Sequence, residues 1–477
     1  PTQEAIEELT NGSKTGGNIG HKENEDDQRS NAHDDGLLFT VALGNERGNG
    51  DRIQPYGIAA DNPSLTELAH EGTIFRNMYC CAPTCSPSRA AMLTGQTPHN
   101  CGMLGLAHRG FALERPNEHL ANHLRKNGYH TVLFGVQHEA VKSDVIKLGY
   151  CEINNFSGKN SSETDFNNLE GVRKFLSDPK NLGRPFFLSL GLNNTHKPWP
   201  KARNPEPDYV IPPFPIADTP ETRIEYCNYL ESLSIVDRCV GGVMDALKEN
   251  GLWDNTVMLF TTDHGLAYPN MKCNLYDTGI GVSFILRIPG RERGVCNALC
   301  SHIDLYPTVC DILGIEKPKF LQGRSMMPLL DKEIEEINEF VFSEVTFHAT
   351  YQPMRSVRSK QYKLIRFYDG ANESRPANID AGRAKDLYLG TKYFHKAKPK
   401  ELFFDLYADP TERVNLAEDP EYAEEYARHA RALEDWQKRT DDPIINGASM
   451  IDMGKGKLMN SLDERDPNPN ASFVIGE

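Results

Sequence analysis

Short apolar runs alternate with longer amphipathic stretches along most of this chain, a pattern that predicts strands and helices in turn. Two stretches have helical spacing, LANHLRKNGY and the long YLESLSIVDRCVGGVMDALKENGLW. The runs that predict buried strands are LLFTVAL from Leu37, HTVLFGV from His130, RPFFLSLGL from Arg184, TVMLFTT from Thr256 and VSFILRI from Val282. This alternation predicts an α/β fold, in which helices sandwich a large and mainly parallel sheet.

The pattern changes near both ends of the chain. Residues 1–36 are rich in Gly, Asn, Asp, Glu, Lys and Ser and predict a flexible N-terminal lead-in. After about residue 345, MRSVRSKQYKLIRFYD and ELFFDLYADP alternate like strands and precede the helical stretch PEYAEEYARHARALEDWQKRT. We therefore expect a large α/β domain over residues 37–345 and a smaller C-terminal α+β domain over residues 346–477.

Charge and hydropathy narrow the classes of function. The 477 residues carry 52 basic and 67 acidic side chains, a net charge of -15, which argues against a nucleic-acid-binding protein. An anionic substrate would therefore need a local pocket of positive charge. No apolar run is long enough for a membrane span, and the chain starts at Pro1 without a signal-peptide pattern. These features predict a soluble protein.

Eleven cysteines leave at least one thiol outside any intrachain disulfide, because the number is odd. Three of them lie close together in CCAPTCSPSRAAMLTG, at Cys80, Cys81 and Cys85. Their spacing does not match the paired C-x-x-C pattern of zinc sites, and a chain of this length does not need disulfides to hold a core. The cluster is therefore either a loop with buried thiols or a segment in which one cysteine has a catalytic role.

Polar side chains follow three of the predicted strands directly. In an open parallel sheet the carboxyl ends of the strands meet at one edge, where ligands bind. The residues expected to converge there are Gln137 and His138, the segment from Asn193 to Pro198, and Asp263, His264 and Gly265 followed by Lys272. Each has an ordinary explanation alone, since a strand-end histidine is usually a satisfied loop residue and a lone lysine is usually solvated. Together they suit a metal-assisted attack on an anionic ester.

The segment from Cys85 to Gly95 resembles the signature of the sulfatase family, C-x-P-S-R-x-x-x-L-T-G. Other segments are also similar to the family, among them NPSLTELAHEGTIFRNMYC, TTDHG, KCNLYDTGIGVSFILRIPG, SHIDLYPTVCDILGI, GRSMMPLL and ELFFDLYADPTERVNLAED. The resemblance runs from about residue 37 to the tail. It implies an alkaline-phosphatase-like α/β fold, a catalytic domain over residues 37–345, and hydrolysis of a sulfuric ester or a sulfamate.

The family resemblance also implies roles for single residues. Cys85 would be oxidised by a separate formylglycine-generating enzyme to formylglycine, whose hydrate attacks sulfur with one hydroxyl and expels sulfate with the other. A helix expected near Ser88 would favour the sulfate anion at its N-terminus. The implied catalytic residues are Cys85, Arg89, His138, His196 and Lys272, and the implied metal ligands are Asp263, His264 and Cys85 itself. Calcium is the implied ion, with magnesium as the alternative.

Two departures from the family pattern concern this site. Val136 stands where the family usually has a lysine, which removes one cation from the expected sulfate pocket. The family also has an Asp-Asp pair directly after its first strand, whereas LLFTVAL runs into Gly44 and Asn45. Three explanations are open: Asp34 and Asp35, which precede the strand, complete the metal site; Glu46 or Asp51 substitutes for them; or half of the metal site is missing.

The segments NCGMLGL, QPMRSVRSKQYKLI and WQKRTDDPI resemble the heparan N-sulfatase branch of the family, which acts on N-sulfoglucosamine. The expected substrate is therefore a sulfated sugar of the glycosaminoglycan heparan sulfate, with His108, Arg109 and Arg355 as candidate carbohydrate contacts. For QPMRSV, a plain strand of the smaller domain is an equally weighted explanation.

Other functions are open at this point. They are an aryl- or O-sulfatase, a phosphonate monoesterase with the same nucleophile, and a catalytically impaired protein that binds sulfated glycans. A secreted, periplasmic or lysosome-like compartment and a homodimer are what the family resemblance implies.

Overall fold

The structure, a computed structural model, describes residues 38–44, 54–56, 60–203, 206–370, 375–395, 397–455, 458–460 and 472–474. The predicted lead-in over residues 1–36 lies outside these ranges. The described residues belong to one compact unit by their internal contacts. None of the described helices is both long and apolar enough to cross a membrane.

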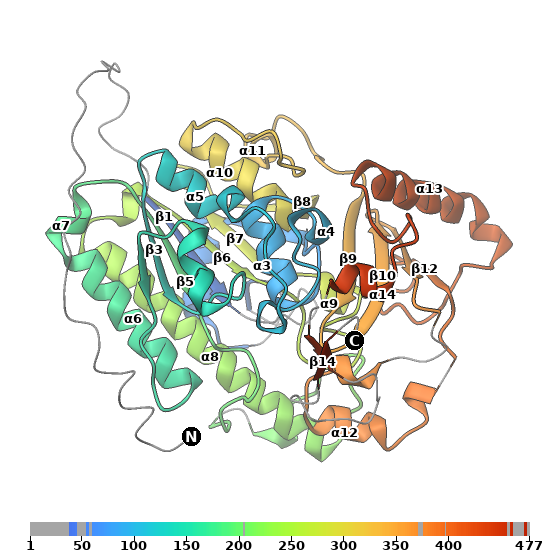
Figure 1. The fold of residues 1–477 in the computed structure, drawn as a ribbon. Helices are drawn as coiled ribbons and strands as arrows, with labels where there is room; N and C mark the ends of the chain where they lie inside the picture. The colour runs from blue at the N-terminus through green and yellow to red at the C-terminus, as the bar shows by residue number, and fades with distance from the viewer. Residues whose placement is uncertain are drawn as a thin grey trace. The chain divides into compact units, whose positions relative to one another are not determined.

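The centre of the fold is an eight-stranded sheet with the order β4-β3-β5-β1-β6-β7-β2-β8 (Figure 1). Its strands are β1 Leu38–Gly44, β2 Thr73–Tyr79, β3 His130–Gly135, β4 Glu152–Asn154, β5 Phe186–Gly191, β6 Thr256–Thr262, β7 Phe284–Arg287 and β8 Gly294–Ser301. All pairings are parallel except those of β7, which runs antiparallel to both β6 and β2. The predicted mainly parallel sheet is therefore confirmed, and each of the five apolar runs contains one strand.

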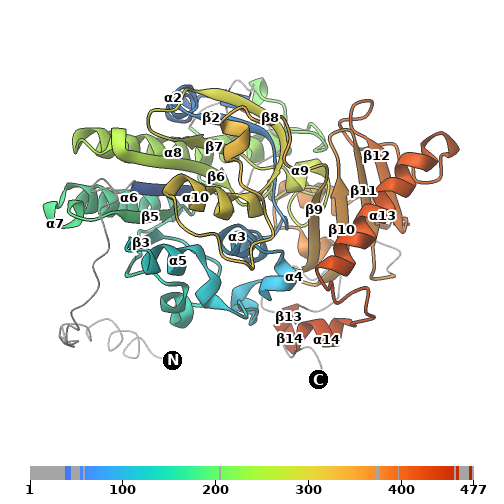
Figure 2. The ribbon, with the colours of Figure 1, turned by 90° about the horizontal axis from the view of Figure 1, so that it is seen from above.

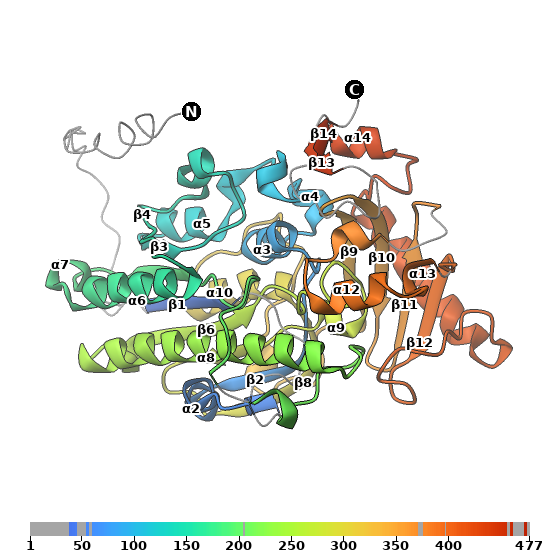
Figure 3. The same cartoon turned by 90° about the horizontal axis from the view of Figure 1, so that it is seen from below.

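Helices cover both faces of this sheet (Figures 2 and 3). The α-helices of the described chain are α2 Pro63–Glu71, α3 Cys85–Thr94, α4 Pro98–Cys101, α5 Leu120–Lys126, α6 Ser161–Ser177, α7 Pro179–Leu182, α8 Pro220–Glu249, α9 Asp277–Ile280, α10 Leu305–Leu313, α11 Met327–Leu330, α12 Arg383–Leu389, α13 Ala423–Arg439 and α14 Met450–Gly454. One hydrophobic cluster contains residues of α3, α5 and α10, and another contains residues of α2, α6 and α8.

The strands read as continuous apolar runs because both of their faces are buried. In β5, Phe187 packs in the first cluster, whereas its neighbours Phe186 and Leu188 pack in the second. In β6, Leu259 and Phe260 divide in the same way. Successive side chains of a strand point to opposite faces, so a sheet between two helical layers needs apolar residues at every position.

A second sheet follows in the C-terminal part of the chain. Its strands are β9 Val341–Phe347, β10 Tyr351–Arg358, β11 Tyr362–Phe367 and β12 Glu401–Asp405, and all pair antiparallel in sequence order. Helix α13 lies across β10 and β11 (Figure 2) and contributes Leu433 and Trp436 to a separate hydrophobic cluster. A short pair, β13 Leu458–Asn460 and β14 Ser472–Val474, follows.

The predicted boundary between residues 345 and 346 falls inside β9. The second sheet begins at Val341, a few residues before the expected change of domain. The division into a catalytic and a smaller domain stays a prediction.

Arg355 belongs to the packing of this second sheet. Its side chain has no solvent exposure, and its guanidinium donates to both oxygens of Asp442 at 2.7 and 2.9 Å and lies 3.2 Å from Glu344. A side chain without exposure cannot contact a carbohydrate in this structure. We therefore correct the interpretation of Arg355 as a substrate contact and assign it to the buried charge network of β10.

Arg355→Ala is expected to destabilise the protein, because it leaves two buried carboxylates without their shared cation. The expected loss is about 3–5 kcal/mol of unfolding free energy, measured by urea denaturation. The surface variant Arg173→Ala, whose ion pair with Glu170 joins side chains that are 43% and 59% exposed, is the control and is expected to lose at most about 1 kcal/mol. Equal stabilities of the two variants would contradict the structural role of Arg355.

Candidate active site

The carboxyl ends of β3, β5, β1 and β6 lie side by side at one edge of the main sheet. The pairing brings Gly135 of β3 beside Gly191 of β5, and Gly44 of β1 beside Thr262 of β6. The polar segments that follow these strands therefore start at the same edge, as the sequence predicted.

Cys85 is the first residue of α3, and its side chain is buried. The predicted helix start near Ser88 is corrected by three residues. Pro87 does not prevent the earlier start, because the first turn of a helix needs no backbone donor at that position. The Cys85 Sγ lies 3.4 Å from His264 Nε2.

The surroundings of Cys85 are cationic. Burial by itself would raise the pKa of the thiol, but Lys272 and His264 and hydrogen bonds from His138 and His196 hold this pKa well below its usual range. A negative charge at the position of Sγ is therefore stabilised from several sides. This is the property that an anion-binding pocket requires.

Asp263 connects the end of β6 to α3. Its Oδ2 accepts a hydrogen bond from Arg89 Nε at 3.0 Å, and its backbone oxygen accepts one from Ser88 Oγ at 2.5 Å. Both Arg89 and Asp263 are almost completely buried. These bonds fix the Asp263 carboxylate beside the first turn of α3 and therefore beside Cys85.

Cys85, Asp263 and His264 form a buried group whose ligand atoms all lie within 4.8 Å of one another. The Nδ1 of His264 donates to the Gly265 carbonyl at 2.8 Å, which leaves Nε2 directed toward Cys85. A backbone bond of this kind is the usual way to orient a metal-binding imidazole. Burial would lower the pKa of His264, but the Asp263 carboxylate and the Cys85 thiolate raise it to about 9, so a bound ion would take the place of the Nε2 proton. The donor set therefore fits part of a divalent-metal site.

The loop after β5 is held by a buried carboxylate of α6. Asp165 accepts bonds from the backbone nitrogens of Asn193 and Asn194 at 2.7 and 2.9 Å, and from both amide side chains. In the same loop, His196 Nδ1 donates to the Lys197 carbonyl at 2.6 Å. The His196 ring is thereby fixed at the wall of the pocket.

A cavity of about 640 Å³ opens beside Cys85. Its chemically active lining residues are Cys85, Ser86, His108, Arg109, His138, Asn193, His196, Lys197, Lys272, His348, Asp380 and Lys385. Lys272 is 2% exposed, so the solvated-lysine explanation does not apply to it. Of the candidate carbohydrate contacts, His108 and Arg109 line this cavity. Val136 lines it as well.

Three of these lining residues, His348, Asp380 and Lys385, were not predicted from the sequence. His348 follows β9, and Asp380 lies in the loop before α12, where Asp380 Oδ2 is 2.7 Å from Lys272 Nζ. Lys385 lies in α12, and all three come from the C-terminal part of the chain, about 260 residues or more after Cys85. In the sequence, only His348 carries a signal, which is its position at the end of a strand. Tertiary packing decides which segments of the C-terminal part face the pocket.

The other half of the expected metal site lies outside the described residues. That holds for Asp34 and Asp35 and equally for Glu46 and Asp51. In the described part, β1 runs from Leu38, opposite Thr256, to Gly44, opposite Thr262 and one residue before Asp263. The chain that leaves Gly44 therefore starts at the edge of the sheet that carries Cys85, whereas Leu38 lies at the other end of the strand.

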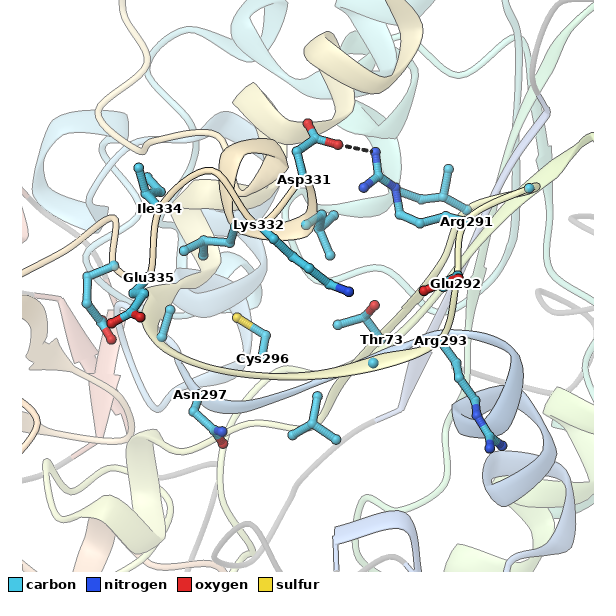
Figure 4. A pocket seen from close by; sticks show the side chains of 18 of the residues that line it. Thr73, Arg291, Glu292, Arg293, Cys296, Asn297, Asp331, Lys332, Ile334 and Glu335 are labelled. Carbon is cyan, nitrogen blue, oxygen red and sulfur yellow. Dashed lines mark hydrogen bonds and ion pairs between the residues drawn. The ribbon is translucent and has the colours of Figure 1, made fainter.

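A larger cavity of about 890 Å³, shown in Figure 4, is lined by residues at the amino end of β2 and around the start of β8. It is lined by Thr73 at the start of β2, by Arg293 just before β8, and by Cys296 and Lys332, and it contains an Arg291–Asp331 ion pair of 2.7 Å. None of the described candidate catalytic, metal-binding or carbohydrate-binding residues lines this cavity. Because β2 and β8 run parallel to β1, their amino ends point away from the site of Cys85.

Comparisons with known proteins agree with this geometry. A family profile described as Sulfatase matches residues 46–315, and one described as N-sulphoglucosamine sulphohydrolase, C-terminal, matches residues 270–388. The N-sulphoglucosamine sulphohydrolase of Homo sapiens is 27% identical, with 81% of this chain and 87% of that protein covered. An Ulvan-active sulfatase of Formosa agariphila is 26% identical, with 81% and 72% covered.

Solved structures share the fold. A 2-O GAG sulfatase superposes with a TM-score of 0.66 at 22% identity, covering 86% of this chain and 94% of the other. A protein solved in complex with its substrate, D-glucosamine-2-N,6-O-disulfate, superposes with a TM-score of 0.67 at 17% identity, covering 85% and 98%. The matched residues include Cys85, Asp263 and the strands that bring them together, and they amount to more than half of the chain. This protein is therefore an enzyme of the sulfatase family.

Proposed function

We propose that this protein hydrolyses a sulfate or sulfamate group of a sulfated sugar, with N-sulfoglucosamine as the favoured unit. The observation that carries the proposal is the position of Cys85: it lies in a cationic pocket, 3.4 Å from His264 Nε2 and within the buried group that includes Asp263. The relatives named above support the sugar, since one is an N-sulphoglucosamine sulphohydrolase and another acts on ulvan.

Cys85 is the residue that we expect to be converted to formylglycine. In the converted enzyme, the position of Sγ corresponds to the oxygens of the hydrated aldehyde, which supply the nucleophile. The residues around this position suit such a group, because Lys272 and the surrounding histidines stabilise negative charge there. The modification depends on a separate formylglycine-generating enzyme.

Asp263 and His264 are the described residues that would hold a divalent ion, with calcium favoured because the donors expected around it are mostly oxygens. Such an ion, when bound, polarises the sulfate oxygens and stabilises a negatively charged nucleophile. Arg89 holds Asp263 by the 3.0 Å bond from its Nε and thereby orients one carboxylate oxygen toward the site. The remaining ligands would come from residues after Gly44, or from Asp34 and Asp35.

The other pocket residues bind and move protons. Lys272, at 2% exposure, is placed to contact the sulfate oxygens. His196 has Nδ1 engaged with a backbone carbonyl, so its Nε2 is the atom that can give a proton to the leaving oxygen or nitrogen. His138 is placed to hold or accept a proton at the nucleophile, since it lines the same cavity and helps to lower the pKa of the Cys85 thiol.

Parallel assays test the sugar assignment. We expect sulfate release from N-sulfoglucosamine with a kcat/KM at least about tenfold above that for a chromogenic aryl sulfate, because a pocket lined by many polar groups rewards a polar substrate. Turnover of the aryl ester alone would reject the sugar, and preferential turnover of an aryl phosphonate monoester would favour a phosphonate monoesterase. Ion chromatography of released sulfate is the measurement.

A further inference from the structure

One arginine and three lysines line the cavity beside Cys85, and the three lysines have partners. The partners lie within 2.8 Å and are Asp380 for Lys272, Glu225 for Lys197 and the Ile379 carbonyl for Lys385. Arg109 differs: within the described ranges, its side chain has no hydrogen bond or ion pair, and its Nε is enclosed without an acceptor. The cavity therefore contains one cation, Arg109, for which the described residues supply neither a hydrogen-bond acceptor nor an ion-pair partner.

Arg109 is buried as well as unpaired. The residue is 8% exposed, and burial lowers the pKa of its guanidinium. Taking a guanidinium out of water without a counter-ion costs several kcal/mol, so buried arginines are normally paired. An unpaired guanidinium at the wall of a substrate pocket indicates that an anionic group of the bound substrate supplies its partner.

The backbone holds Arg109 in a fixed position relative to Cys85. It is the last residue of the 3₁₀ turn Ala107–Arg109, which Gly110 closes at φ 90° with a bond to the Ala107 carbonyl. The Ala107 nitrogen donates to Ser86 Oγ at 3.0 Å, and Ser86 directly follows Cys85 in α3. A side chain on such a short, anchored turn is preorganised for binding.

We propose that Arg109 binds a second anionic group of the sugar substrate while the scissile sulfate lies at Cys85. The favoured substrate is therefore a dianionic sugar unit, whose second charge is either a carboxylate or a further sulfate. A guanidinium presents paired N–H donors that match the two oxygens of either group. This inference rests on the proposed function, and it adds a specificity residue that acts on the substrate away from the reacting bond.

Kinetics with three sugars test the proposal. They are N-sulfoglucosamine, its 2-N,6-O-disulfate, and N-sulfoglucosamine linked to a uronic acid, with the carboxyl-reduced disaccharide as a neutral match. For Arg109→Gln we expect KM to rise about ten- to hundredfold for the dianionic sugar whose charge reaches Arg109, with kcat nearly unchanged. The two dianionic arms distinguish sulfate from carboxylate. The change for N-sulfoglucosamine itself should be smaller than about threefold.

The stability of the variant separates binding from a structural role. Arg109→Gln removes an uncompensated buried charge, so we expect its Tm without ligand to be equal to or above that of the wild type. Arg115→Gln, an arginine of the same region that is paired with Glu118 and does not line the cavity, is the control and should leave the kinetics of all sugars unchanged. A clear fall in Tm for Arg109→Gln, or an equal KM increase for all sugars, would overturn the proposal.

A thermal-shift measurement tests the binding of the second anionic group by Arg109 without relying on turnover. The dianionic sugars should raise the Tm of the wild-type protein more than N-sulfoglucosamine does, and Arg109→Gln should lose that difference. If the wild type hydrolyses none of the sugars, the proposed function fails, and the thermal shifts still decide whether Arg109 binds the second anion. Equal shifts for all sugars in the wild type would reject it.

Discussion

Cys85→Ala is expected to lower kcat/KM for sulfate release by on the order of 10⁴-fold or more, because it removes the nucleophile that the other pocket residues serve. The fold should be retained, since Cys85 is small and lies at the start of α3, not within a strand. The assay is sulfate release from N-sulfoglucosamine, together with the Tm of the variant. An active Cys85→Ala enzyme would reject covalent catalysis at this residue.

Cys81→Ala is the matched control for this experiment. Cys81 lies in the same stretch and is also buried, but its Sγ contacts Ser301 Oγ at 3.3 Å and does not line the pocket of Cys85. This variant should keep its activity within about threefold. A mass measurement of the peptide that contains Cys85 completes the test, because an aldehyde supports turnover. A persistent thiol in a host that has the modifying enzyme would favour the alternative of a catalytically impaired, glycan-binding protein.

Asp263→Asn should have the second largest effect, because Asp263 has two tasks. As a carboxylate it balances the buried Arg89, and its loss is expected to cost about 3–5 kcal/mol of unfolding free energy. As a metal ligand it is expected to contribute several kcal/mol to the transition state, so kcat/KM should fall on the order of 10³-fold. Urea denaturation and sulfate release measure the two effects separately.

Metal dependence provides the decisive comparison for Asp263. The wild-type protein should gain unfolding free energy on addition of calcium, about 2.7 kcal/mol at a hundredfold excess over Kd, and lose it with a chelator. Asp263→Asn should show little gain, whereas Asp254→Asn, at a 99% exposed side chain, should behave like the wild type. A full calcium response in Asp263→Asn would show that this residue is not a metal ligand.

Calorimetry with calcium on the double variant Asp34→Ala, Asp35→Ala decides whether that pair completes the metal site.

Much of the fold followed from the sequence because its signals are local. The apolar runs of β3, β5 and β6 are continuous, and only a sheet covered on both faces requires this. Helix α3 starts three residues before the predicted position near Ser88, since the first helical turn accepts Pro87. The antiparallel direction of β7 was also not predicted, since an apolar run of four residues carries no signal of strand direction.

Some residues of the candidate site could be predicted from the sequence, and others could not. The residues directly after strands, such as His138, His196 and Asp263, could be predicted to converge, because parallel strands end at one edge. Arg355 could not be assigned correctly from its sequence, since its buried partner Asp442 lies 87 residues away. Asp380 was missed for the same reason: it reaches Lys272 across 108 residues of chain.

The sequence by itself determined the sulfatase signature around Cys85, the five main-sheet strands that lie in apolar runs, and the set of residues at the strand ends. These depend on spacing along the chain, on helical and strand periodicity and on turn position. Only the tertiary structure decided that Arg355 is buried in a charge network, that Asp380 and His348 enter the pocket, and that Arg109 lies there without a described counter-ion. The physical reason is that burial and ion pairing depend on which distant segments pack together, and one-dimensional spacing does not contain that information.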